Sequence, residues 1–93
     1  MIKATKIRMK QYCMNSMKLE EIKDIKLEGD LSNPGWFSKE SVHDYIKFKN
    51  GIVNVDKYPT YPKLVVVTTM TDKYVKSTPN EYGFDNLLKL PRE

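Results

Sequence analysis

Apolar and polar residues alternate at the beginning of the chain, and this period of two predicts a β-strand over residues 2–10. Ile7 and Met9 fall on one side of an extended backbone there. The other side carries a row of cations: Lys6, Arg8 and Lys10. Because successive side chains on one face of a strand lie about 7 Å apart, this row forms a basic stripe.

The pattern is weaker in the next part of the chain. Residues 11–18 show no period and are expected to form a loop. Residues 19–29 fit both a helical and an alternating spacing, because their apolar positions are Leu19, Ile22, Ile25 and Leu27. We favour a strand over about 21–28, because a helix there would lack capping residues.

The clearest helix is predicted over residues 38–49. The turn residues 33–35 (Asn-Pro-Gly) come before it, and proline followed by glycine is typical of a tight turn. Ser38 is expected to cap the helix, and Gly51 is expected to end it. One helical face is shared by Val42, Tyr45, Ile46 and Lys49.

Three more strands are predicted after the helix, over residues 52–57, 63–70 and 74–78. The second is a continuous run of valine and threonine, so we expect it to be the central and most buried strand. A stiff aromatic connector with two prolines precedes it, and a hairpin turn follows it. At the end of the chain, Asp85 is expected to cap a short helical turn that ends before Pro91.

These elements predict one α+β domain over residues 1–93, in the order β-β-α-β-β-β plus a C-terminal turn. One helix packs on a small antiparallel sheet or half-open barrel in this prediction. The chain of 93 residues is 40% hydrophobic and 30% charged, which is typical of one globular domain. The sequence leaves open whether the strand edges close a barrel or form an oligomer.

Composition narrows the class of protein further. The single cysteine excludes an intramolecular disulfide and favours a reducing cytosol, and we expect a cytoplasmic bacterial or phage protein. No apolar run approaches the roughly 18 residues of a membrane span, so we expect no membrane partner. The net charge is +4, but residues 1–18 carry five cations and no acid, whereas residues 19–30 carry five acids and two lysines. Because these segments can neutralise each other, the net charge is weak evidence for a polyanionic partner.

The most distinctive segment is the C-terminal string Tyr-Gly-Phe-Asp-Asn-Leu-Leu-Lys-Leu-Pro, at residues 82–91. It accompanies three other features, namely Ile2–Met9, Trp36 and Gly51–Val55. In these positions the chain resembles DUF3892, a small bacterial family of domains of unknown function. The chain departs from the family pattern at Phe84, where tryptophan is expected, and in its long connector 58–62. The resemblance implies the fold above, and it implies no activity, cofactor or catalytic residue.

The sequence offers few candidates for catalysis. Cys13, His43 and Asp44 are the ingredients of a thiol nucleophile and its base, but nothing in the spacing brings the loop cysteine beside the helix. His43 lies opposite the apolar helical face and is expected to face solvent. One histidine and one cysteine cannot form a zinc site without two carboxylates. We therefore expect no enzyme activity, no metal and no cofactor.

A basic strand face is the first candidate binding surface. Lys6, Arg8 and Lys10 share this face, and Tyr12 lies just beyond it. Cations and stacking rings on a sheet are how many small β-rich proteins bind single-stranded nucleic acid. The alternative is that the lysines only protect an edge strand from aggregation.

Aromatic residues form the second candidate surface. Trp36 follows a turn, and Tyr58 and Tyr61 lie on the rigid connector, so all three suit a protein partner. Asp85 and Asn86 can orient a ligand at a helix N-terminus, but such residues cap helices more often. We rank a protein partner first, nucleic acid second and an unrecognised enzyme third. The enzyme would need a pocket that contains Asp85, Asn86 and a tyrosine hydroxyl.

Overall fold

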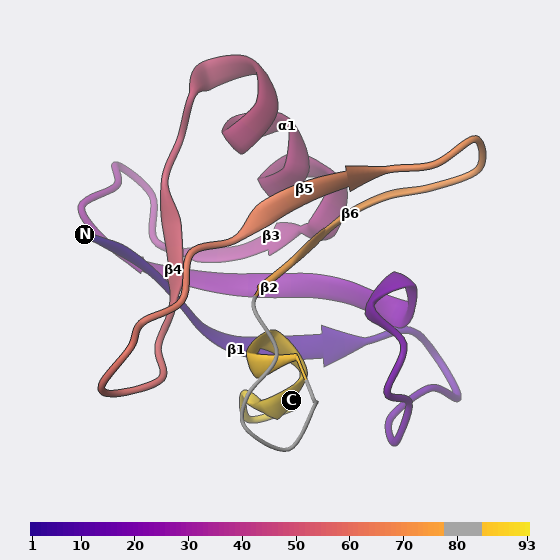
Figure 1. The fold of residues 1–93 in the computed structure, drawn as a ribbon. Coiled ribbons are helices and arrows are strands. Elements are labelled where there is room, and N and C mark those ends of the chain that lie inside the picture. The colour runs from indigo at the N-terminus through magenta and orange to yellow at the C-terminus, as the bar shows by residue number, and fades with distance from the viewer. Residues whose placement is uncertain (78–84) are drawn as a thin grey trace.

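The structure is a computed structural model that describes residues 1–77 and 85–93 (Figure 1). It contains one α-helix, α1 (Lys39–Lys49), and two short 3₁₀ helices, η1 (Leu19–Glu21) and η2 (Asn86–Lys89). The strands are β1 (Ile2–Met9), β2 (Ile22–Gly29), β3 (Gly35–Ser38), β4 (Val53–Val55), β5 (Val65–Thr68) and β6 (Lys73–Lys76). The predicted α+β fold, with one helix on a small sheet, is confirmed.

The main sheet has four strands in the order β3-β2-β1-β4. β2 runs antiparallel to both β1 and β3, whereas β4 runs parallel to β1. The prediction of a wholly antiparallel sheet is therefore wrong. A parallel pair needs a long crossover connection, and α1 provides it when it returns the chain to the free edge of β1.

β3 is a strand that the sequence pattern does not predict. The pattern assigns residues 33–35 to a turn and leaves Trp36 and Phe37 without an element. In the structure, Trp36 pairs with Lys26 and Phe37 with Ile25 of β2. A strand of four residues is too short to show a clear alternation, so only its pairing with β2 identifies it.

α1 begins and ends where the sequence predicts, but the residue that stops it is a different one. The Ser38 hydroxyl accepts a hydrogen bond from the Ser41 N–H at 3.1 Å, as expected of an N-cap. The left-handed residue at the C-terminus is Asn50, with φ of 52°, and not Gly51. Asparagine tolerates this conformation, so it replaces glycine in that role. Gly51 instead gives room to Tyr45, because a Cβ at Gly51 would lie 2.1 Å from the ring.

The valine-rich segment is not the central strand. Its core, β5, pairs only with β6 among the described strands, and Val65 is 46% exposed. Leu64 is buried and its N–H donates to the Val53 carbonyl at 2.8 Å, but the chain then leaves the main sheet. The β5–β6 hairpin extends to one side of the molecule in Figure 1. A valine run indicates a central strand only when a neighbour pairs on each side, and β1 and β2 have that position here.

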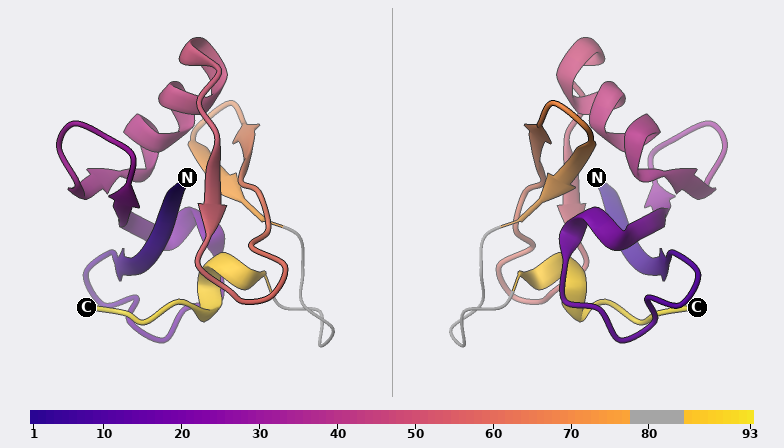
Figure 2. Two further views of the ribbon diagram at one scale, coloured as in Figure 1. Left: turned by 90° about the vertical axis from the view of Figure 1, so that its left-hand side faces the viewer. Right: turned by 90° about the vertical axis from the view of Figure 1, so that its right-hand side faces the viewer.

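One apolar core joins the inner face of the main sheet to the helices. That face contributes Ala4, Ile7 and Met9 from β1 and Ile22, Ile25 and Leu27 from β2. Figure 2 shows α1 at one end of the molecule and η2 at the other, with the strands between them. The core is closed by Val42 of α1 and, near the C-terminus, by Leu87, Leu88 and Leu90.

The C-terminal segment docks onto this core, as the sequence predicts. Asp85 caps η2, because its carboxylate accepts the Leu87 N–H at 2.8 Å. Beyond η2, the Ile7 N–H donates to the Pro91 carbonyl at 2.9 Å and the Glu93 N–H to the Ile7 carbonyl at 3.0 Å. The end of the chain therefore occupies the edge of β1 that β4 leaves free. Two predicted features, Phe84 and the strand end at Thr78, lie outside the described residues.

Candidate functional site

The predicted basic stripe lies on the outer face of the main sheet, and much of its charge is neutralised. Lys6 and Arg8 are half-buried there and lie directly opposite Lys26 and Asp24 of β2. Arg8 Nη1 lies 3.6 Å from Asp24 Oδ2, and Lys6 Nζ lies 3.6 Å from Glu93 Oε2. The third cation, Lys10, is exposed beyond the end of β1.

The predicted aromatic residues are not brought together. Trp36 is half-buried under Arg8, whose guanidinium carbon lies 4.1 Å from the ring centroid. Tyr58 is exposed and meets Tyr61 edge to face, with ring centroids 6.3 Å apart. Tyr61 lies beside the start of β1, whereas Tyr12 is exposed in the loop after its other end. These residues therefore form no single patch.

Asp85 and Asn86 lie at the start of η2, where Asp85 forms hydrogen bonds within the fold. Besides capping η2, the Asp85 carboxylate accepts hydrogen bonds from the Ser77 N–H at 3.0 Å and from the Ser77 hydroxyl at 2.6 Å. Asn86 is half-buried at the start of η2. Because both oxygens of Asp85 bind protein donors, this carboxylate ties the end of β6 to the C-terminal segment.

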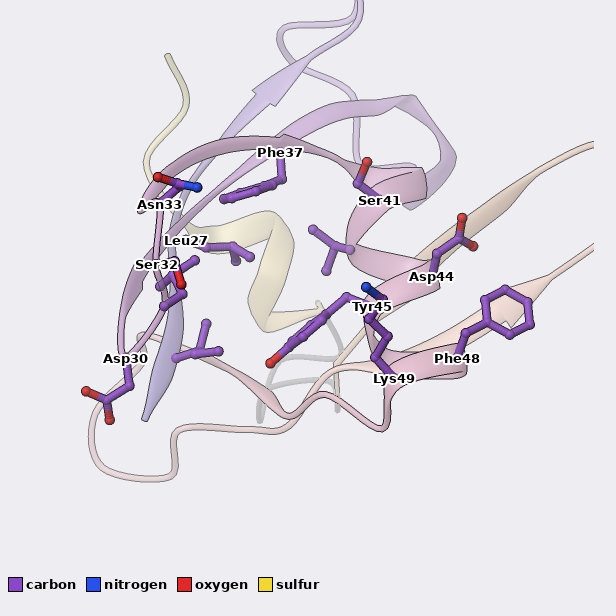
Figure 3. A pocket seen from close by; sticks show the side chains of 13 residues that line it. Leu27, Asp30, Ser32, Asn33, Phe37, Ser41, Asp44, Tyr45, Phe48 and Lys49 are labelled. Carbon is purple, nitrogen blue, oxygen red and sulfur yellow. The ribbon is translucent and has the colours of Figure 1, made fainter.

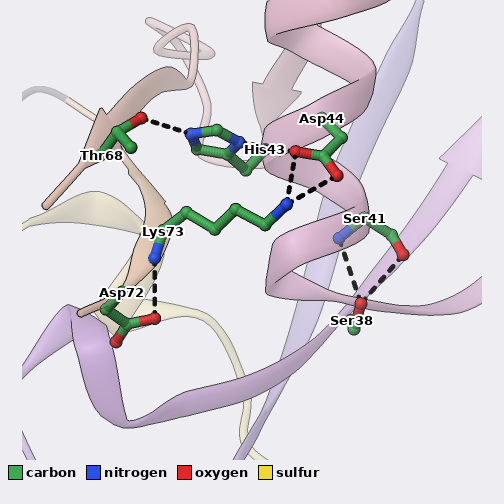
Figure 4. A network of polar contacts seen from close by, with 7 residues as sticks. All are labelled: Ser38, Ser41, His43, Asp44, Thr68, Asp72 and Lys73. Atoms are coloured by element: carbon green, nitrogen blue, oxygen red, sulfur yellow. Dashed lines mark hydrogen bonds and ion pairs between the residues drawn. The ribbon is translucent and has the colours of Figure 1, made fainter. Parts of the chain in front are cut away.

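The prediction that His43 faces solvent is wrong, because its side chain is almost fully buried. The β5–β6 hairpin covers this side of α1, and His43 Nε2 lies 2.7 Å from Thr68 Oγ1 (Figure 4). His43 Nδ1 lies 3.0 Å from Asp44 Oδ1, and Lys73 Nζ donates to both oxygens of Asp44 at 2.9 and 3.0 Å. A second connection between α1 and the hairpin is made by the buried Lys39, whose ammonium donates a hydrogen bond to Asp72 at 2.9 Å.

The order hydroxyl, imidazole, carboxylate in this cluster matches that of a nucleophile, its base and the group that orients the base. Neither the groove between α1 and the β2–β3 turn nor the hollow in the loop after β1 is lined by Thr68 or His43. The Asp44 carboxylate is also held by Lys73, which lowers the pKa of Asp44 through their hydrogen bonds. The cluster therefore fits a connection between the hairpin and α1 better than a catalytic site.

Cys13 lies apart from His43 and contacts Glu21 instead. The Cys13 thiol donates to Glu21 Oε2 at 3.1 Å. This hydrogen bond to a carboxylate raises the pKa of the Cys13 thiol, so the reactive thiolate is disfavoured. No group of three or more metal-ligating side chains is found in the described part of the chain.

A groove lies between α1 and the β2–β3 turn. It encloses about 760 Å³, within the range of ligand-binding clefts. Leu27 and Phe37 form part of its apolar floor, and Tyr45 points into it from α1, whereas the ring of Phe48 points outward at its edge (Figure 3). The opposite wall is the turn, with Asp30, Leu31, Ser32 and Asn33.

The walls of the groove are positioned by the fold. Tyr45 packs over Gly51, whose missing Cβ leaves space for the ring. Phe48 lies on the last turn of α1, and its side chain is 69% exposed to solvent. The enzyme hypothesis needs a pocket that contains Asp85, Asn86 and a tyrosine hydroxyl. This groove contains Tyr45, but neither Asp85 nor Asn86 lines it.

The charges of the groove are partly neutralised by nearby groups. Asp30 Oδ2 lies 2.6 Å from the N-terminal ammonium of Met1, and this hydrogen bond lowers the pKa of Asp30. Asp44 is held by Lys73, as described above. Lys49, at the end of α1, is exposed and has no ion pair among the described residues.

Sequence reasoning missed this groove because its parts come from separate segments. The floor combines β2 with β3, and the sequence pattern does not predict β3. The available signal was the helical face shared by Val42, Tyr45, Ile46 and Lys49, on which we predicted no site. Val42 is buried, but Tyr45 is only half-buried and Lys49 is exposed.

Comparison with known protein families identifies the chain. The family model of DUF3892, described as a protein of unknown function, matches residues 3–91. The chain belongs to the DUF3892 family. No match was found among the curated proteins or among the solved structures.

In this DUF3892 protein, the residues that carry the family resemblance hold the fold together. Trp36 packs under Arg8, and Leu87 and Leu88 of η2 enter the core. The groove is lined largely by other residues, such as Tyr45 and Phe48. No helix of the described chain is long and apolar enough to cross a membrane.

Proposed function

We propose that this DUF3892 protein is a non-enzymatic binding module that receives apolar side chains of a partner protein in the groove. The observation that carries the proposal is the concave, apolar floor beside the exposed ring of Phe48. Aromatic residues beside a well-packed pocket are the usual anchor points of protein interfaces. We place this activity in the bacterial cytoplasm, as the single cysteine suggests.

The groove suits this role because its shape exists before a partner arrives. Leu27 and Phe37 are fixed by pairing between β2 and β3, and Tyr45 is held over Gly51. A preformed site loses less conformational entropy on binding than a flexible one. Ser32, Asn33 and Ser41 at the rim offer hydrogen bonds to a polypeptide backbone.

A library of random peptides displayed on phage tests the proposal. The wild-type protein is expected to enrich peptides with aromatic or branched apolar anchors, and Ser41→Trp, which fills the groove from its rim, should lose them. Lys63→Trp is the matched control, because Lys63 is exposed and lies outside the groove. Phe48→Ala provides a second test at an exposed position. Enriched peptides that bind Ser41→Trp and Phe48→Ala as well as the wild type would refute the proposal.

Weak binding of single-stranded nucleic acid is the second candidate. It is supported by two cation–aromatic pairs on or beside the outer sheet face, Arg8 over Trp36 and Lys3 over Tyr61. It ranks second because Lys6 and Arg8 already have acidic partners. An amide NMR titration with a mixed-sequence oligonucleotide at two salt concentrations tests it. Shifts over residues 6–12 that weaken with salt would favour nucleic acid, and no shifts at either concentration would eliminate it.

A further inference from the structure

The groove carries one uncompensated charge. Its two carboxylates, Asp30 and Asp44, are bound by the N-terminal ammonium and by Lys73. Lys49 is the cation that lines the groove, and no ion pair within residues 1–77 and 85–93 neutralises it. The groove therefore presents a net positive charge beside an apolar surface.

Lys49 is well placed to bind a charged group on an apolar ligand. Its side chain lies alongside Tyr45 on the groove wall in Figure 3, so its ammonium borders the apolar floor. The hydrocarbon stem of a lysine packs on apolar surface while its ammonium stays hydrated. A carboxylate that approaches there makes a charge-assisted hydrogen bond, which is stronger than a neutral one.

We infer that the partner is a peptide segment with a carboxylate next to its apolar anchor, and that Lys49 binds this carboxylate. This inference rests on the proposed function, because it names the chemistry of the partner in the same groove. Charge complementarity also argues against a second copy of this chain as the partner, since each copy has a net charge of +4. We assign the carboxylate to an Asp or Glu side chain of this segment.

The same peptide selection, repeated on charge variants, tests the inference. The wild type is expected to enrich acidic residues beside the anchor, and Lys49→Glu should enrich basic residues at that position instead. Lys63→Glu changes the net charge equally but lies outside the groove, so its selection should match that of the wild type. For one selected peptide, Lys49→Met is expected to weaken binding about two- to five-fold, the size of an exposed ion pair.

The possible results separate the inference from the proposed function. Peptides that depend on the groove but show no acidic preference would overturn the inference and leave the proposed function standing. An acidic preference that survives in Lys49→Glu would also overturn it. A selection with no groove-dependent peptides would refute both the inference and the proposed function. Synthetic peptides with an amidated C-terminus, with and without an internal Glu, distinguish a side-chain carboxylate from a terminal one.

Discussion

The substitution Leu87→Ala tests whether the C-terminal segment is part of the folding core. Leu87 is 0% exposed in η2, and Leu88 and Leu90 beside it are also buried. The segment adds backbone hydrogen bonds to the edge of β1 through Ile7. Loss of the Leu87 side chain leaves a cavity at the point where η2 meets the sheet.

We expect Leu87→Ala to lower the free energy of unfolding by about 2–5 kcal/mol, the usual cost of such a buried truncation. A domain of this size has a stability of about 5–14 kcal/mol, so the loss is a large fraction of the total. Each kcal/mol corresponds to roughly 4–8 °C in Tm, which gives an expected decrease of about 8 °C or more.

Urea unfolding followed by the fluorescence of Trp36 measures this effect, because Trp36 is the only tryptophan of the chain and is half-buried. Lys63→Ala is the control outside this segment, since Lys63 is exposed and its truncation should cost at most about 0.5 kcal/mol. If Leu87→Ala unfolds at the same urea concentration as the wild type, the segment is not docked and our interpretation of the C-terminus is wrong.

Two further predictions concern polar contacts. Glu21→Gln should move the pH midpoint of Cys13 alkylation downward, because the Glu21 carboxylate raises the pKa of the thiol; an unchanged alkylation profile would contradict this. Asp72→Asn should cost about 3 kcal/mol, because it leaves the buried Lys39 ammonium without its carboxylate and with the Glu20 carbonyl as its remaining partner. Because the Lys39 hydrogen bond lowers the pKa of Asp72, the stability difference from Asp72→Asn should shrink as pH falls through the folded pKa, as acid-dependent urea unfolding can measure.

Features set by neighbouring residues could be predicted from the sequence. The Ser38 cap depends on a hydroxyl and a backbone N–H three residues later, and the Asp85 cap on a carboxylate and a backbone N–H two residues later. β1 follows from apolar residues that alternate along the strand, whereas β2 was favoured over a helix because its segment lacks capping residues. These interactions are local, so the sequence pattern alone contains the information.

Features set by distant segments could not be predicted. Nothing near β4 specifies that it pairs parallel to β1, because the crossover through α1 determines that direction. The periodic pattern of α1 allows one buried face, and the hairpin covers a second side and buries His43. Charge pairing is equally nonlocal, since Lys6 binds Glu93 at the far end of the chain.

The fold and the groove share the apolar floor, but the exposed residues of the groove wall lie outside the core, and this makes the proposed function testable apart from stability. Leu87 and Leu88 are fully or nearly buried, so their truncation weakens the folded state wherever the partner binds. Phe48 and Lys49 are exposed, so their substitution should leave the unfolding free energy within about 0.5 kcal/mol of the wild type. A loss of peptide binding in Phe48→Ala at unchanged stability can therefore be assigned to the groove itself. An equal loss of peptide binding in Leu87→Ala would be explained by unfolding. Comparing the two variants therefore separates a defect in the groove from a defect in stability.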